Sequence, residues 1–62
     1  MNIEEITIGD EISVKDSQTE QFLTGMVTDI CEITQTVIYR LGNGAVRFCQ
    51  ANKISVLIKT WD

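Results

Sequence analysis

The sequence predicts a small all-β domain in which five short strands bend around one core. Apolar and polar residues alternate over short runs, no amphipathic helix of ordinary length is visible, and glycines interrupt the runs. An open sheet of three or four strands would leave one face of so much Ile and Val uncovered, so we expect closure into a barrel. The 62 residues form a single domain, 1–62, with its core between about residues 6 and 59.

The N-terminal third is predicted to hold a loose lead-in at residues 1–5 and one bent strand. The alternative for the lead-in is one helical turn, because Asn2 followed by two glutamates is a typical start for a helix. Apolar residues alternate over residues 6–14 as in a strand, and Gly9 interrupts the run where a bend is expected. Residues 15–21, KDSQTEQ, are polar throughout and are predicted to form an exposed loop.

The remaining strands follow at short intervals. Residues 22–31 form the second strand, in which Gly25 and the broken alternation of Val27 and Ile30 indicate a β-bulge or strong twist. A connection at 32–35 leads to the third strand at 36–41, and the fourth occupies 45–49. Residues 50–53 are long enough for one 3₁₀ turn, and a β-branched run at 54–59 forms the last strand before a short tail.

The strongest local signal is a hairpin centred on Asn43-Gly44, because a two-residue type I′ turn needs positive φ at both central positions. This turn pairs Arg40 with Arg47, unless the register is shifted by one residue. The core side of the hairpin would carry Leu41, Tyr39, Val46 and Phe48. The outward side would carry Ile38, Arg40, Arg47 and Cys49.

The order of these signals resembles that of the SH3-like small β-barrels, including the Tudor and KOW groups. The similar features are Gly9-Asp10 before Ile12 and Val14, the polar loop, Gly25-Met26-Val27 with Ile30, the hairpin, the 3₁₀ turn and the closing strand. The resemblance covers about residues 6–59 and implies a five-stranded SH3-like barrel. It assigns no single function, because such barrels bind proline-rich peptides, methylated tails, RNA and protein partners. The aromatic groove and cage of those groups are missing here, and so is a basic excess.

The charge is unevenly placed along the chain. Residues 1–20 carry six carboxylates against Lys15 alone, a net charge of −5, whereas residues 21–62 carry +1. A phosphate-binding surface normally needs a basic excess, and the acidic flank favours a basic partner instead. The acidic set that mimics a phosphate backbone, if it shares one surface, is Glu4, Glu5, Asp10, Glu11, Asp16 and Glu20. The alternative is an ordinary solvated face that keeps the protein soluble.

Nothing in the sequence supports catalysis. Histidine is absent, and Cys31 and Cys49 lack the spacing of a metal site, so we expect no catalytic residue, metal or cofactor and interpret both cysteines as reduced thiols. The chain has no apolar run of the roughly 20 residues that span a bilayer and no signal-peptide core. We therefore expect a cytoplasmic protein, and its small size suggests a bacterial or phage origin.

Three groups of residues are candidates for binding. The facing Arg40 and Arg47 would grip an anion, or a nearby carboxylate neutralises them. The carboxylates Glu11, Asp16 and Glu20 would contact a basic partner. An exposed apolar patch is predicted for Met26, Ile38, Leu57 and Trp61, with the alternative that Trp61 caps one end of the barrel.

These observations lead to two function hypotheses. The first is a non-enzymatic protein-interaction module, an accessory or inhibitory factor for a basic, nucleic-acid-handling partner, acting as a monomer or a homodimer. The second is direct association with nucleic acid through Arg40, Arg47, Lys53 and Lys59, with Tyr39 or Trp61 stacking on bases. A purely structural subunit of a larger assembly is the remaining alternative.

Overall fold

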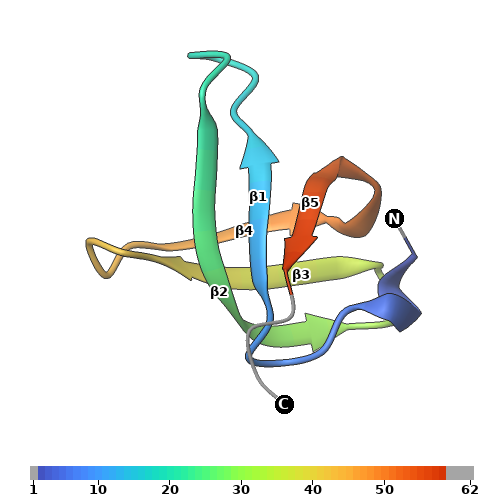
Figure 1. Cartoon of the computed structure of the whole chain (residues 1–62). Helices are drawn as coiled ribbons and strands as arrows, with labels where there is room; N and C mark the ends of the chain where they lie inside the picture. The colour runs from blue at the N-terminus through green and yellow to red at the C-terminus, as the bar shows by residue number, and fades with distance from the viewer. Residues whose placement is uncertain (1, 59–62) are drawn as a thin grey trace.

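The computed structural model describes residues 2–58 and shows one antiparallel sheet with two single-turn 3₁₀ helices (Figure 1). The elements in chain order are η1 (Ile3–Glu5), β1 (Glu11–Lys15), β2 (Phe22–Cys31), β3 (Thr36–Leu41), β4 (Val46–Gln50), η2 (Ala51–Lys53) and β5 (Ile54–Ile58). The strand order in the sheet is β4-β3-β2-β1-β5. The predicted all-β architecture and the 3₁₀ turn before the last strand are confirmed.

β2 is the long strand that bends the sheet. Its first half pairs with β1 and its later residues pair with β3, with an irregularity between Val27 and Asp29 that confirms the predicted bulge. Gly25 pairs with Ile12 of β1 on one side and with Leu41 of β3 on the other. A Cβ atom at Gly25 would lie only 2.6 Å from the carbonyl oxygen of Arg40. Figure 1 shows that β1 and the first half of β2 run across the direction of β3 and β4.

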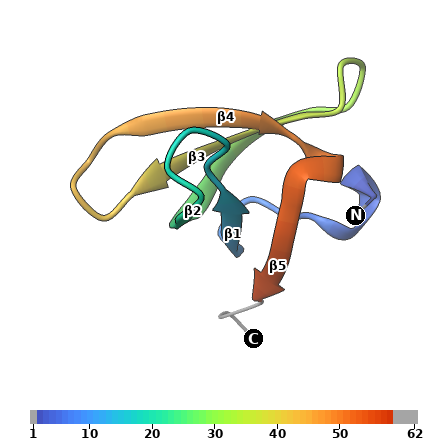
Figure 2. The same ribbon diagram turned by 90° about the horizontal axis from the view of Figure 1, so that it is seen from above.

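The two edges of the sheet are β4 and β5, and η2 connects them around one end of the molecule (Figure 2). Within residues 2–58 no pairing joins these edges, so the described sheet is not closed into a barrel. The backbone N–H of Ala51 donates to the carbonyl oxygen of Gln35 at 2.9 Å, which attaches η2 to the β2–β3 turn.

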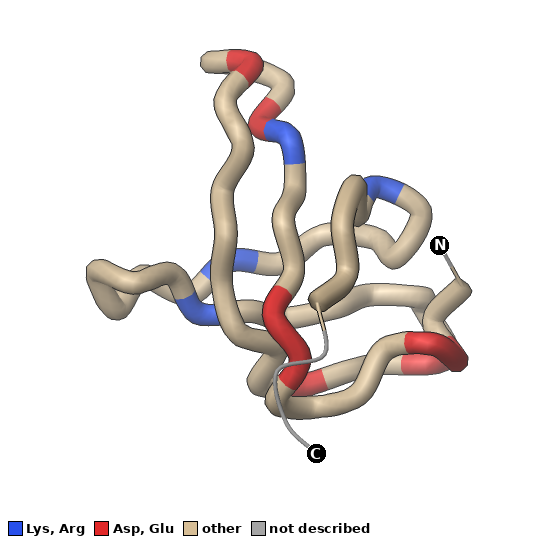
Figure 3. Tube along the Cα trace, in the orientation of Figure 1, with Lys and Arg blue, Asp and Glu red and all other residues tan. Residues whose placement is uncertain are grey.

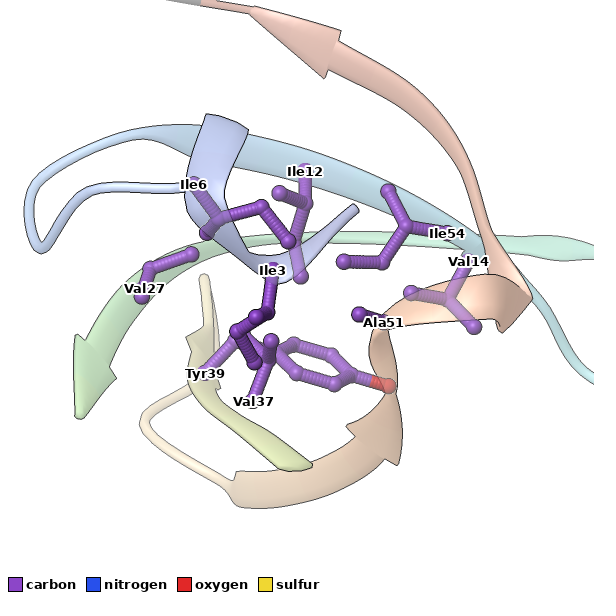
Figure 4. Packing of buried hydrophobic residues seen from close by; sticks show 9 residues of the cluster. All are labelled: Ile3, Ile6, Ile12, Val14, Val27, Val37, Tyr39, Ala51 and Ile54. Carbon is purple, nitrogen blue, oxygen red and sulfur yellow. The ribbon is translucent and has the colours of Figure 1, made fainter. Parts of the chain in front are cut away.

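The core lies between the two crossing parts of the sheet. It is formed by nine buried side chains that point toward one another in Figure 4: Ile3, Ile6, Ile12, Val14, Val27, Val37, Tyr39, Ala51 and Ile54. Every element except β4 contributes to this cluster, so β4 covers the core only through partly buried Cys49.

The predicted strand at 6–14 begins later than expected. Residues 6–10 form an irregular segment and a turn, and the strand starts at Glu11. The carboxylate of buried Asp10 accepts a hydrogen bond from the backbone N–H of Thr7 at 2.9 Å, and Gly9 takes a φ of 100°. A short polar side chain that accepts a hydrogen bond from a nearby backbone N–H stabilises a turn at the expense of a strand, which explains the difference.

The hairpin register predicted from Asn43-Gly44 is wrong by one residue. Arg40 pairs with Val46 and Tyr39 pairs with Arg47. The loop has three residues, because the N–H of Leu41 donates to the carbonyl oxygen of Ala45 at 2.8 Å. Only Gly44, with a φ of 90°, occupies the left-handed region, which is the arrangement of a type I turn followed by a left-handed glycine.

This shift moves every side chain of β4 to the other face, because side chains alternate along a strand. Val46 and Phe48, expected in the core, are 59% and 76% exposed on the outer side of the sheet. Arg47 and Cys49, expected outside, share the face of Tyr39 and Val37. The expectation that Leu57 of β5 belongs to an exposed patch is also wrong, because Leu57 pairs with fully buried Ile12 and packs against the core.

Candidate functional site

The outer face of the sheet carries a row of paired residues that crosses all the described strands. From β4 to β5 this row reads Val46, Arg40, Met26, Glu11 and Ile58. Arg40 and Glu11 therefore stand on either side of Met26, with their backbones about 10 Å apart at the usual strand spacing. The row combines two opposite charges with apolar side chains.

Large apolar side chains of this face are open to solvent. We use the name outer patch for Met26, Val46, Phe48, Val56 and Ile58, whose exposed fractions range from 41% to 76%. Half-buried Ile38 pairs with Phe48 and adjoins the patch. Met26 and Ile38 thus lie on the predicted apolar patch, whereas Leu57 does not and Trp61 lies outside the described residues.

A hollow of about 400 Å³ lies over the middle of the outer face. Its lining includes Met26, with Glu11 and Arg40 on the neighbouring strands, and Gly25. The hollow therefore offers an apolar floor with one positive and one negative group at its sides.

A second cavity, of about 470 Å³, lies between β1, β3, β4 and η2. We call it the basic cavity, because its lining includes Lys15, Arg47 and Lys53 and only one carboxylate, Asp16. Its other lining residues are Val14, Ser17, Tyr39, Phe48 and Cys49. The register explains this grouping, since Arg47 shares the face of Tyr39 and lies away from Arg40.

Tyr39 connects the core to the basic cavity. The residue is 3% exposed, and Figure 4 shows its ring within the core cluster that also contains Ala51 of η2. Burial raises the pKa of the Tyr39 phenol above its ordinary value, and neighbouring Arg47 opposes this rise. The phenol therefore remains protonated at neutral pH and keeps an O–H group that can donate a hydrogen bond.

The structure does not bring the predicted acidic surface together. Asp16 and Glu20 lie in the β1–β2 loop, where the N–H of Glu20 donates to the carbonyl oxygen of Asp16 at 2.8 Å. Glu11 lies at the other end of β1, Glu4 and Glu5 belong to η1, and Asp10 is buried. Figure 3 shows these carboxylates separated toward opposite ends of the molecule.

The two cysteines differ in environment. Cys31 is exposed at the end of β2, and hydrogen bonding from the Thr34 side chain and backbone lowers the pKa of its thiol. Burial raises the pKa of the Cys49 thiol. Among residues 2–58, no group of three His, Cys, Asp or Glu side chains is placed to hold a metal ion. No helix in this part of the chain is long and apolar enough to span a bilayer.

Comparison with known proteins adds no family or function. The chain matches no family model, no curated protein and no solved structure.

Sequence reasoning missed the outer patch as a unit and the basic cavity. A two-residue loop at Asn43-Gly44 predicts core positions for Val46 and Phe48, whereas the observed three-residue loop places both on the outer side. The signal that favours the observed register is Gly42 beside Asn43-Gly44, since three small or turn-forming residues also fit a three-residue loop. Lys15 and Arg47 line the same cavity only because segments distant in the sequence meet in the fold, and the sequence carries no local signal for such contacts.

Proposed function

We propose that this protein is a non-enzymatic, SH3-like binding module that docks a protein partner on the outer face of its sheet. The observation that carries the proposal is the part of the outer patch on β2 and β4, where Met26, Val46 and Phe48 are exposed on the outer side of the sheet on either side of β3. Large apolar groups gathered on a surface typically mark interaction sites, whereas single exposed apolar residues need no explanation.

The composition of the outer face supports a protein as the partner. Aromatic residues, Met and Arg are enriched in protein interfaces, and this face presents Phe48, Met26 and Arg40. The hollow beside Met26 provides a place for one partner side chain, and Glu11 and Arg40 would orient the approach. The net charge of −4 favours encounter with a partner of positive net charge.

The SH3-like assignment is supported by the order of the elements. A meander of four strands, a 3₁₀ turn and a fifth strand beside the first give the order β4-β3-β2-β1-β5. The strong bend at the β2 bulge brings the two halves of the sheet over a common core. Closure into a barrel would require pairing between the edge strands β4 and β5.

The alternative function, association with nucleic acid through an arginine pair, has weaker support. Arg40 and Arg47 point to opposite faces of the sheet, so they cannot grip one phosphate together. Arg47 and Lys53 do share the basic cavity with Tyr39. Steep weakening of oligonucleotide binding with rising salt, abolished by Arg47→Glu, would favour this alternative.

Photocrosslinking in cells tests the proposed docking face. The photoreactive amino acid p-benzoylphenylalanine replaces Phe48, which is exposed and tolerates a larger ring. The matched control places the same amino acid at Ile33, which is 94% exposed in the β2–β3 turn and outside the outer patch. We expect a discrete protein adduct from position 48, resistant to nuclease and absent from position 33.

The same experiment separates the alternatives. An adduct between two copies of the chain would identify a homodimer as the partner on this face. Equal labelling from both positions, no adduct from position 48, or an adduct lost on nuclease treatment would each contradict the proposal. Adding Met26→Lys to the position-48 protein should remove the adduct, because a charge would then occupy the floor of the hollow.

A further inference from the structure

The basic cavity gathers most of the positive charge in the described chain. Three of the four Lys and Arg residues between positions 2 and 58, Lys15, Arg47 and Lys53, line it, together with Asp16. The local charge is therefore +2 in a protein whose net charge is −4. The fourth cation, Arg40, lies on the other face of the sheet. This concentration of positive charge, against the charge of the whole chain, indicates a site for an anion.

The size and floor of the cavity suit a small ligand. Its volume of about 470 Å³ falls within the range of about 300–1,000 Å³ that is common for small-molecule sites. Tyr39 and half-buried Cys49 line it from the core side, and the protonated phenol of Tyr39 supplies a hydrogen-bond donor. The cavity thus combines three cationic side chains with a hydrogen-bond donor, the Tyr39 hydroxyl, that the core holds in a fixed position.

We propose that the basic cavity binds a small molecule that carries a phosphomonoester group and has the size of a mononucleotide. A phosphomonoester carries about −1.5 to −2 charges at pH 7, which matches the local charge of +2. The guanidinium of Arg47 can hold two phosphate oxygens at once, and Lys15 and Lys53 neutralise the remaining charge. The Tyr39 hydroxyl then donates to the phosphate or to its bridging oxygen.

A polymer of phosphates fits the surroundings less well than a single terminal phosphate. Outside the cavity, the β1–β2 loop carries Glu20, and the net charge of the chain is −4. These charges repel phosphates that lie outside the cavity, whereas a mononucleotide places its charge inside it. The proposal goes beyond the function proposed above, because Arg47 lies on the opposite face of the sheet from Met26.

Titration of the ¹⁵N-labelled protein by NMR tests the proposal. The probe is adenosine 5′-monophosphate, and the matched ligand without the charge is adenosine. We expect the monophosphate to shift the amide signals of Lys15–Ser17, Arg47–Cys49 and Lys53, and adenosine to leave them in place. Inorganic phosphate should shift the same amides at higher concentration, because it makes fewer contacts.

Three variants decide whether the cavity is responsible. Arg47→Gln and Lys53→Gln should each weaken monophosphate binding by about tenfold or more, since each removes a charged hydrogen-bond donor. Arg40→Gln makes the same chemical change on the other face of the sheet and should leave the affinity unchanged. The spectrum of each variant also reports whether it has folded, and Lys53 is exposed in η2, where the loss of its charge leaves the core intact.

Several results would overturn the proposal. One is an equal loss of affinity in Arg40→Gln, and another is the absence of shifts with millimolar monophosphate. Tighter binding of a single-stranded oligonucleotide or of a phosphoserine peptide would assign the cavity to a macromolecule instead. Phe48 lies at the rim of the basic cavity as well as in the outer patch, whereas Met26 lies outside the cavity. The Met26→Lys arm of the photocrosslinking experiment therefore tests the docking face separately from the ligand titration.

Discussion

Arg47 lies directly opposite Tyr39 in the β3–β4 pairing, and this relationship connects the core to the basic cavity. The ring of Tyr39 is buried, whereas Arg47 is exposed at the rim of the cavity that both residues line. One cross-strand pair thus holds a buried hydrogen-bond donor beside an exposed cation. The same register places Val46 and Phe48 in the outer patch, so both the outer patch and the basic cavity depend on it.

Replacing Phe48 should have little effect on stability. The side chain is 76% exposed, so we expect Phe48→Thr, which keeps a strand-forming residue, to change the free energy of unfolding by no more than about 0.5 kcal/mol. Val37→Ala, at a fully buried position of the paired strand, should cost about 2 kcal/mol or more. Urea denaturation measures both. A loss of about 3–5 kcal/mol in Phe48→Thr would return Phe48 to the core and restore the register expected from the sequence.

The difference between the predicted and the observed β3–β4 register explains how much of this fold the sequence predicts. The bounds of β2 and β3 follow from local alternation and from turn residues at 32–35, so the predicted strands at 22–31 and 36–41 match the structure. Alternation in Val46–Cys49 places an apolar side chain on both faces, and Asn43-Gly44 fits loops of two or three residues. Local chemistry therefore leaves the register of β4 open, and packing around Tyr39 and Val37 decides it.

The candidate sites were harder to predict than the strands, for a related reason. Arg40 and Arg47 were expected side by side, and a shift of one residue places them on opposite faces. Lys15 and Lys53 are far apart in the sequence and meet Arg47 only through the positions of β1 and η2. Such sites depend on long-range pairing, which periodicity within a single strand does not encode.

Gly25 should tolerate no side chain. A Cβ atom at this position would lie 2.6 Å from the Arg40 carbonyl oxygen and 3.0 Å from Cδ2 of Tyr39, so we expect Gly25→Ala to destabilise the protein by about 1–3 kcal/mol. Gly42→Ala is the matched control, because a Cβ there meets nothing within 4 Å. It should be neutral or stabilising by about 0.5 kcal/mol, since alanine restricts the unfolded chain. Equal midpoints of thermal unfolding for the two variants would mean that β2 and β3 are farther apart than described.

The stability of the protein should fall at alkaline pH through Tyr39. Burial raises the pKa of this phenol above its ordinary value of about 10, and Arg47 offsets part of the rise. The folded state then binds more protons than the unfolded state above pH 10, so the free energy of unfolding decreases as the pH rises through the pKa of the folded state. Urea unfolding between pH 8 and about 11.5 measures this slope. In Tyr39→Phe the slope should be shallower, and an unchanged slope would exclude Tyr39 as the group that titrates.

The thiol of Cys31 should react faster than that of Cys49. Hydrogen bonding from the Thr34 side chain and backbone lowers the pKa of Cys31, whereas burial raises the pKa of Cys49, and the thiolate is the reactive form. Brief treatment with iodoacetamide near neutral pH should therefore label Cys31 first, as peptide mass spectrometry would show. Thr34→Val removes the side-chain donor and should move the pH profile of Cys31 labelling to higher pH, whereas Thr19→Val, an exposed threonine in the β1–β2 loop, should not. If Cys49 reacted first, or if both threonine variants shifted the profile equally, the Thr34 hydrogen bonds would not control this thiol.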